Sequence, residues 1–460
     1  MKTLIVFCIA VFSLAQTQAK VSDLHKPNII VIMADDLGYG DLGIYKGVQS
    51  TPNLDKMARE GMRFFDFHSS GTVCSPTRAG LLTGRYQQKA GVDGVINANA
   101  SHPAHSLGVD PQTQITFPKL VKTQGYATAL FGKWHLGYRQ RFHPMHFGFD
   151  RFVGFLSGNI DYISHYDRME KFDWWHNTEK VVEEGYTTQL ITKHAVEFIE
   201  KNKNKPFVLY VSHAAVHSPM QGPNSQILRG PNKKKIKKVD EQKVYSEVIA
   251  ELDKSVGQII TAVEQAGLSE STLILFTSDN GPMKYSSAGP LRGQKGSLYE
   301  GGHRVPMIAW WPGVVASNSV TEQLASTLDI MPTIVSLTGA KLPDNHRLDG
   351  VDLMPTLLGL APVDRVLFWR KGGLHFHSKK LIAQDSEKAM RKGKWKLVIS
   401  PYYEQISLYD LSADISEQDD VAQKHPQIVA QLTARMKAWE EKILPYLPYK
   451  IQPQNTNMEQ

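Results

Sequence analysis

The stretch Asn28–Ala34, with the sequence NIIVIMA, runs directly into Asp35-Asp36 and decides the fold class. A strand that is buried on both faces is apolar at every position, whereas a strand with one wet face alternates. We therefore expect a central strand of a parallel sheet here, followed by two carboxylates at its carboxyl end. In open α/β sheets, that end of the strands is where ligands bind.

Similar apolar runs recur along the chain and alternate with helical patterns. This alternation is typical of an α/β fold, and we expect a large, mainly parallel sheet sandwiched by helices over residues 26–360. Besides the first strand, the expected strands are Tyr126–Phe131, Phe207–Ser212, Thr272–Thr277 and Pro306–Trp311. The expected helices are Leu54–Glu60, Thr116–Gln124, Thr187–Asn202 and Glu241–Gln265.

The pattern changes after residue 361, where shorter apolar segments follow one another without helices between them. We expect a smaller C-terminal α+β unit over residues 361–450, made of a short antiparallel sheet packed by a terminal helix. Its expected strands are Val366–Arg370, Lys379–Asp385, Trp395–Ile399 and Leu408–Leu411, and its expected helix is Val421–Ile443.

The N-terminus, Met1–Ala19, has the features of a signal peptide: a positive charge at Lys2 and the apolar run Leu4–Leu14. That run is too short to span a bilayer, so we expect it to be cleaved and the protein to be exported, either periplasmic or secreted. No later stretch approaches transmembrane length, so no membrane span is expected.

Composition indicates a globular protein with an anionic partner. The chain of 460 residues is 42% hydrophobic and 21% charged, and its formal net charge is +7. A basic exported protein suits a sulfated glycan or a nucleic acid. The densest basic run, Lys233–Lys238, is explained more simply as a solvated loop, and no nucleic-acid-binding motif accompanies it. We therefore expect no nucleic-acid partner.

Cys74 is the one cysteine expected in the mature protein, because Cys8 lies in the signal peptide. An exported protein with a single thiol has no internal disulfide. Cys74 opens the sequence CSPTR, in which Pro76 fits the first position of a helix, and this predicts Cys74 at a helix N-terminus. Backbone N–H groups favour an anion there. The alternative is a buried structural cysteine, since cysteine is among the most buried residue types.

A second polar pair, Asp279-Asn280, follows the apolar run Thr272–Thr277. If this strand neighbours the first one, three carboxylates and one amide oxygen meet at one edge of the sheet. Hard oxygen ligands suit Ca²⁺ or Mg²⁺. For either pair alone the alternative is ordinary turn chemistry, because Asp and Asn commonly end strands.

Three further segments carry candidate groups. Lys133 and His135 share one face if the chain is extended there. His217 follows an expected strand, and Lys295 lies in the segment Arg292–Gly296. Each is a weak signal alone, since lysine is usually solvated and the chain has 17 histidines.

In this order, the motifs resemble those of the type I formylglycine-dependent sulfatases of the alkaline phosphatase superfamily, and of exported carbohydrate sulfatases in particular. The motifs are the Asp-Asp strand end, Cys-x-Pro-x-Arg with the tail Leu82–Arg85, Gly-Lys-Trp-His, the histidine after a strand, Asp-Asn-Gly and Arg-Gly-x-Lys. The resemblance implies that a maturation enzyme oxidises Cys74 to formylglycine. It implies a Ca²⁺ site made by Asp35, Asp36, Cys74, Asp279 and Asn280, and a catalytic set of Cys74, Arg78, Lys133, His135, His217 and Lys295.

The resemblance also implies a mechanism for hydrolysis of a sulfate ester. One hydroxyl of the hydrated aldehyde at position 74 attacks sulfur, and deprotonation of the second hydroxyl then expels sulfate. His135 is implied as the base, and His217 as the proton donor to the leaving alcohol with help from Lys295. Arg78 steadies residue 74, while Ca²⁺ and the lysines, Lys133 among them, stabilise negative charge.

The expected substrate is a sulfated polysaccharide or oligosaccharide, with galactose-type sugars such as carrageenan or chondroitin favoured. The predicted substrate-binding residues are Lys133, His217, Arg292, Lys295, His375 and His377, with Arg370 as a further candidate. Trp174 and Trp175 either stack on sugar rings or pack in the core. Two alternatives stay open: a phosphodiester or phosphonate monoester hydrolase with the same machinery, and a non-catalytic, calcium-dependent glycan binder with an unmodified thiol.

Overall fold

The computed structural model describes residues 26–97, 108–233, 240–371, 386–400 and 404–446. The predicted signal peptide therefore lies outside the described residues, as do His375, His377 and the predicted strand Lys379–Asp385. Within those ranges, no helix combines the length and the apolar character needed to cross a membrane.

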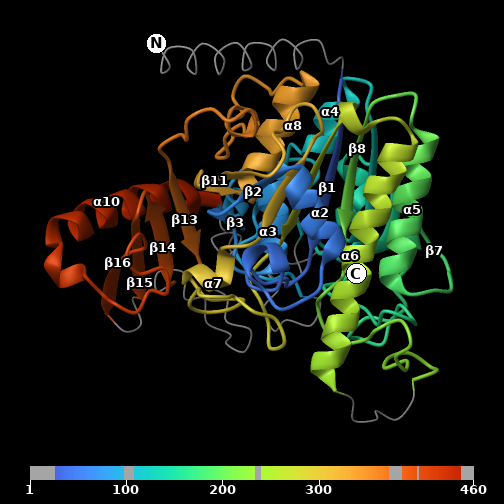
Figure 1. The fold of residues 1–460 in the computed structure, drawn as a ribbon, viewed down its shortest axis with the longest axis horizontal. Coiled ribbons are helices and arrows are strands. Elements are labelled where there is room, and N and C mark those ends of the chain that lie inside the picture. The colour runs from blue at the N-terminus through green and yellow to red at the C-terminus, as the bar shows by residue number, and fades with distance from the viewer. Residues whose placement is uncertain (1–25, 98–107, 234–239, 372–385, 401–403, 447–460) are drawn as a thin grey trace, which may run out of the picture.

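A ten-stranded mixed sheet forms the centre of the molecule, in the order β11-β2-β10-β9-β1-β8-β4-β5-β6-β7 (Figure 1). The five strands from β9 to β5 are mutually parallel, and the flanking pairs β10–β9 and β5–β6 are antiparallel. The predicted class, a mainly parallel sheet with helices, is confirmed. The strands are β1 (Asn28–Ala34), β2 (Met62–Phe64), β4 (Ala127–Lys133), β5 (Arg151–Phe155), β6 (Trp175–His176), β7 (Glu179–Lys180), β8 (Phe207–Ser212), β9 (Thr272–Ser278), β10 (Met307–Trp310) and β11 (Ser319–Thr321).

Both faces of this sheet are covered, which explains why β1 is apolar throughout. Ile30 and Ile32 pack with one set of helices, whereas Ile29 and Val31 pack with the other. The first set is α2 (Pro52–Glu60), α5 (Thr187–Lys201) and α6 (Glu241–Gln265); the second is α3 (Cys74–Thr83), α4 (Phe117–Lys122), α8 (Ile330–Thr338) and α9 (Met354–Leu357).

A separate four-stranded antiparallel sheet, β13-β14-β15-β16, lies with α10 at one end of the molecule (Figure 1). The expected small sheet with a terminal helix is thus confirmed. Helix α10 packs on the sheet through Leu432, Met436, Trp439 and Ile443. The elements are β13 (Val366–Arg370), β14 (Lys388–Lys392), β15 (Trp395–Ser400), β16 (Gln405–Asp410) and α10 (Pro426–Ile443). The short strands β3 (Phe67–His68) and β12 (Ala325–Ser326) form a parallel pair of their own, and α7 (Glu300–His303) lies between β9 and β10 in the chain.

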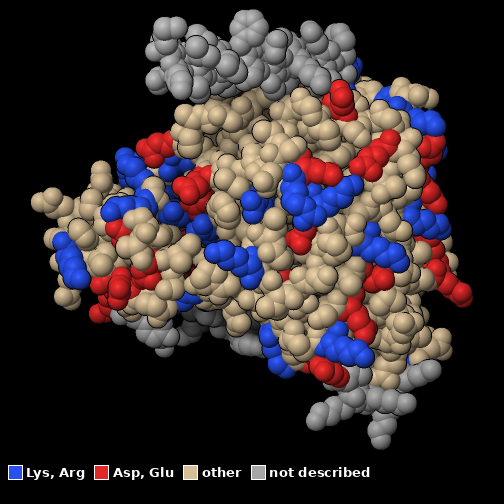
Figure 2. Space-filling view, in the orientation of Figure 1, with Lys and Arg blue, Asp and Glu red and all other residues tan. Residues whose placement is uncertain are grey.

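The net positive charge is not gathered in one patch on the face that Figure 2 shows. Lysine and arginine side chains alternate there with aspartate and glutamate. On this face, binding of an anionic partner therefore depends on a local site, not on a broad basic surface.

Candidate active site

The candidate residues gather at the carboxyl edge of the central strands. β1 and β9 are parallel neighbours with Ala34 opposite Ser278, so Asp35-Asp36 and Asp279-Asn280 leave the sheet side by side. β4 ends at Lys133 and β8 at Ser212, at the same edge. The neighbouring strands required by the sequence argument are therefore present.

Cys74 is the first residue of α3, and Val73 is its extended N-cap. Pro76 is consequently the third helical residue, whereas the sequence predicted it at the first position. Proline is tolerated there because the first four N–H groups of a helix have no intrahelical acceptor. The Cys74 side chain is buried, with Sγ 3.4 Å from Asp35 Oδ1 and 3.3 Å from Lys295 Nζ. Burial, together with Asp279 and Asp35, raises the pKa of the thiol to about 12. The unmodified thiol is therefore protonated near neutral pH and is a poor nucleophile.

Arg78 lies one helical turn after Cys74, and its guanidinium group contacts the carboxyl ends of β4, β8 and β9. Its Nε and Nη2 donate to Asp279 Oδ2 at 3.0 and 2.7 Å. Its Nη1 donates to Ser212 Oγ and to the carbonyl of Lys133. Ser212 is a site residue that the sequence reasoning missed, although its place at the end of an apolar strand was a usable signal.

Two lysines, Lys133 fully buried and Lys295 partly buried, form ion pairs with the first acidic pair. Lys133 Nζ lies 2.6 Å from Asp35 Oδ2, and Lys295 Nζ lies 2.6 Å from Asp36 Oδ1. Burial and the nearby Asp279 raise the pKa of Asp35 to about 7, against the opposing effect of Lys133. For Asp36, burial favours a higher value, but Lys295 and its other partners hold the pKa below the ordinary range.

The donor set at this edge fits a hard divalent cation. Among the described residues, Asp36 Oδ2 and Asn280 Oδ1 are buried without a hydrogen-bond partner. Buried oxygens rarely lack a donor unless water or an ion satisfies them. Together with the carboxylates of Asp35 and Asp279, they supply the oxygen ligands that Ca²⁺ and Mg²⁺ prefer.

The two candidate histidines have different surroundings. β4 ends at Lys133, and His135 has a φ of 55°, so the extended backbone assumed for these two residues is absent. His135 Nε2 is 2.9 Å from the carbonyl of Ile96, and its Nδ1 has no hydrogen-bond partner in the described part of the chain. Burial and the adjacent Lys133 hold the pKa of His135 well below its ordinary value.

His217 faces Asp36 from the segment that follows β8. Its Nε2 is 3.5 Å from Asp36 Oδ2, and its Nδ1 is 2.7 Å from the carbonyl of Ser218. Burial lowers the pKa of His217 to about 3, although Asp36 opposes this. A neutral imidazole therefore lies beside the polar cluster at neutral pH.

Other sequence candidates lie apart from this cluster. Arg292 Nη1 donates to the carbonyl of Glu417 at 2.6 Å, so its role in sugar binding stays a prediction. Arg370 is buried in ion pairs with Asp93 and Glu440. Trp174 is fully buried, which favours the core-packing alternative for its side chain.

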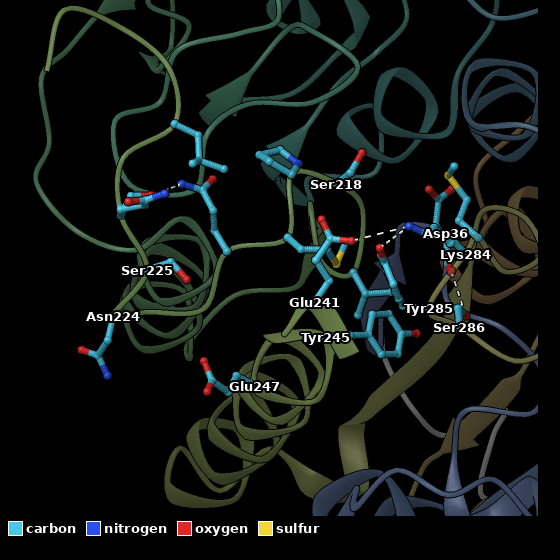
Figure 3. Close-up of a pocket in the computed structure, with 17 residues that line it drawn as sticks. Asp36, Ser218, Asn224, Ser225, Glu241, Tyr245, Glu247, Lys284, Tyr285 and Ser286 are labelled. Carbon is cyan, nitrogen blue, oxygen red and sulfur yellow. Dashed lines mark hydrogen bonds and ion pairs between the residues drawn. The ribbon is translucent and has the colours of Figure 1, made fainter. Parts of the chain in front are cut away.

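A cavity of about 990 Å³ adjoins the cluster at Asp36 (Figure 3). Ser218 and Met220, in the segment after β8, line one part of it, and Glu241 and Tyr245 of α6 line another. Its volume and its mixture of apolar and polar groups are those of a small-molecule binding site.

Comparison with known proteins identifies the family. The family model described as Sulfatase matches residues 27–340, and the one described as N-sulphoglucosamine sulphohydrolase, C-terminal, matches residues 294–442. N-acetylgalactosamine-6-sulfatase of Mus musculus is 37% identical over 372 residues, which cover 75% of this chain and 69% of that protein. Arylsulfatase G of Homo sapiens is 35% identical over 396 residues, which cover 76% of this chain and 72% of that protein.

A solved structure agrees with these relatives. The crystal structure of Ps i-CgsB in complex with k-i-k-neocarrahexaose has a TM-score of 0.80 and 32% identity, with 90% of this chain and 93% of that chain covered. The chain belongs to the sulfatase family. It is accordingly a sulfuric ester hydrolase, and the clustered strand ends are its candidate active site.

Proposed function

We propose that this sulfatase removes sulfate from a sulfated polysaccharide or oligosaccharide of galactose-type sugars, such as carrageenan or chondroitin. The main support is the cavity of about 990 Å³ that adjoins Asp36, because it gives a sugar room beside the residues that would hold its sulfate. Two relatives point to the sugar class: one is named for N-acetylgalactosamine-6-sulfate chemistry, and one was solved with a neocarrahexaose.

We propose that residue 74 acts as formylglycine and that the oxygen cluster holds Ca²⁺. Hydrated formylglycine supplies a hydroxyl for attack on sulfur and a second hydroxyl for release of sulfate. Ca²⁺, held by Asp35, Asp36, Asp279 and Asn280 beside residue 74, supplies positive charge for the sulfate oxygens. The unpartnered oxygens of Asp36 and Asn280 support this assignment.

The chain's own residues bind the sulfate and move protons. Lys133 and Lys295 present ammonium groups at the cluster and offset the negative charge of the ester. His135 keeps Nδ1 without a partner among the described residues, which leaves that atom to accept a proton from residue 74. His217, neutral at rest, gains a proton more readily once an anionic ester lies beside it, and then donates it to the leaving alcohol.

The substrate proposal is tested with protein co-produced with a formylglycine-generating enzyme. The mass of the peptide carrying residue 74 should show an aldehyde in place of the thiol. Sulfate release is then measured by ion chromatography on a panel of sulfated oligosaccharides and on an aryl sulfate. We expect release from galactose-type sulfates. Turnover of the aryl sulfate with none of the galactose-type substrates would refute the substrate class.

The metal proposal is tested by chelation and by two variants. We expect chelation to abolish activity and added Ca²⁺ to restore it. Asn280→Ala keeps the Arg78–Asp279 ion pair intact, so it should fold while binding Ca²⁺ more weakly; Asp279→Ala should lose both Ca²⁺ and activity. Asp344→Ala, which removes an exposed carboxylate, is the matched control. Full activity of chelated Asp279→Ala protein would exclude the assignment.

A further inference from the structure

A second group of potential metal ligands lies away from the active site, where the edge hairpin of the large sheet meets α5. His176 ends β6, Glu183 lies between β7 and α5, and His194 belongs to α5. Their ligand atoms all lie within 4.8 Å of one another. We propose that these residues, the hairpin cluster, form a binding site for Zn²⁺ or a similar transition-metal ion.

The donor types and their convergence support this proposal. His176 Nε2 lies 2.9 Å from Glu183 Oε2, and His194 Nε2 lies 3.0 Å from the same oxygen. Two imidazoles and one carboxylate are a ligand set that Zn²⁺ accepts, with water completing a tetrahedron. The set differs from the all-oxygen cluster at the active site, which suits a harder ion.

The orientation of the two imidazole rings also fits a shared ion. The ring centroids of His176 and His194 are 5.2 Å apart and the ring planes meet at 84°. Two imidazoles bound through Nε2 to one tetrahedral Zn²⁺, with Zn–N distances of about 2.0–2.1 Å, place their centroids roughly 5 Å apart. The rings therefore already have the spacing that one ion requires.

Glu197 provides an independent observation. The His194 side chain is 7% exposed, and its Nδ1 has no hydrogen-bond partner among the described residues. The nearest carboxylate oxygen, Glu197 Oε2, lies 3.5 Å away. If Nε2 carries the ring proton of a neutral His194, a bare nitrogen faces a carboxylate, which is unfavourable. A metal on Nε2 places the proton on Nδ1 and directs it at Glu197, as in carboxylate–histidine–zinc arrangements.

The remaining neighbours are compatible with an ion. Lys193 Nζ lies 3.1 Å from Glu183 Oε1, whereas Oε2 is the oxygen that both imidazoles approach; His194 Nε2 is also 3.0 Å from Oε1. Trp174 Nε1 donates to Oε2 at 3.1 Å and would orient the ligating carboxylate. The His176 side chain is 32% exposed, which gives an ion and a water ligand a route from solvent. The bound ion would fasten the β6–β7 hairpin to α5.

The rival arrangement is a doubly protonated His194 between the carboxylates of Glu183 and Glu197, without a metal. Calorimetric titration of metal-stripped protein with Zn²⁺, in the presence of excess Ca²⁺, distinguishes this arrangement from a metal site. We expect saturable binding with a dissociation constant of micromolar order or tighter. His176→Ala and Glu183→Gln should remove this binding event, and Glu197→Gln should weaken it by about 10–100-fold.

His425→Ala, which removes an exposed histidine, should leave the titration unchanged and is the control. Circular dichroism verifies that each variant is folded, and Glu197 is exposed enough that its replacement should not disturb folding. Cobalt substitution provides a second readout, because a tetrahedral site with imidazole ligands gives intense visible absorption that His176→Ala should lose. Absence of Zn²⁺ uptake by the parent protein, or unchanged affinity in both His176→Ala and Glu197→Gln, would overturn the proposal.

Discussion

Replacement of Lys396 by methionine should weaken the junction between the two sheets. Lys396 is fully buried, with Nζ 2.9 Å from Glu300 Oε1 and 2.8 Å from His303 Nε2. Lys396→Met keeps most of the side-chain volume and removes the charge. Removing one partner of a buried ion pair costs about 3–5 kcal/mol, because the other charge stays buried without compensation.

The structure places the expected loss at the lower end of that range. Two arginines also contact Glu300: Arg304 Nη1 at 3.3 Å and Arg391 Nη1 at 3.6 Å from Oε2. They partly compensate the carboxylate when Lys396 is lost, so we expect the free energy of unfolding to fall by about 3 kcal/mol.

Urea unfolding followed by tryptophan fluorescence measures this change. Adding Glu300→Gln to Lys396→Met should recover part of the loss, because the neutral amide no longer needs the ammonium group. A loss below about 1 kcal/mol, or strictly additive effects in the double variant, would refute the reasoning.

Three further predictions concern other parts of the molecule. Burial raises the pKa of Glu417 from 4.5 to about 7 in the folded protein. The protonated carboxyl group therefore stabilises the fold below the pKa of the unfolded chain, and this stabilisation is lost as pH rises through about 7. Glu417→Gln should reduce the difference between the urea midpoints measured at about pH 5 and about pH 8. Gly132→Ala should abolish soluble expression, since φ is 109° and a Cβ would lie 1.9 Å from the carbonyl oxygen of Ser212; Gly94→Ala, where a Cβ meets open space and φ is not positive, should express normally. His217→Ala should lose about 10²–10⁴-fold in turnover of sugar sulfates and far less with nitrophenyl sulfate, whose leaving group needs no proton; equal losses in steady-state assays would contradict the proton-donor role.

Elements with a single strong signal were predictable from the sequence. β1 matches its predicted bounds because every side chain is buried, and α6 does so because Asp240 caps a long amphipathic pattern. β2 and β14 were missed, since the first has only three residues and the second, KAMRK, is rich in charge. Their strand conformation comes from pairing with neighbours, which local sequence does not report.

The residues of the candidate active site were likewise predictable only where the local sequence carries a strong signal. The acidic pairs were predictable because they end apolar strands, and their meeting then depended only on strand order. The conformation at His135 was not predictable, because its positive φ depends on tertiary contacts. Ser212 was missed because it belongs to no sequence motif. The hairpin cluster was missed because its three residues are separated along the chain and none belongs to a recognised pattern.

If residue 74 acts as formylglycine, as proposed above, the burial of Cys74 limits the time at which the thiol can be oxidised. An enzyme that oxidises the thiol must reach Sγ, yet in the folded protein this residue is only 2% exposed and lies against Asp35 and Lys295. Lys295 follows Cys74 by 221 residues, so this neighbour of the thiol is synthesised well after it. At about 5–20 residues per second, synthesis leaves roughly 10–45 s between the two. Under the proposed maturation, the thiol would therefore have to be oxidised before folding buries it, and a chain that folds first would keep the unmodified thiol.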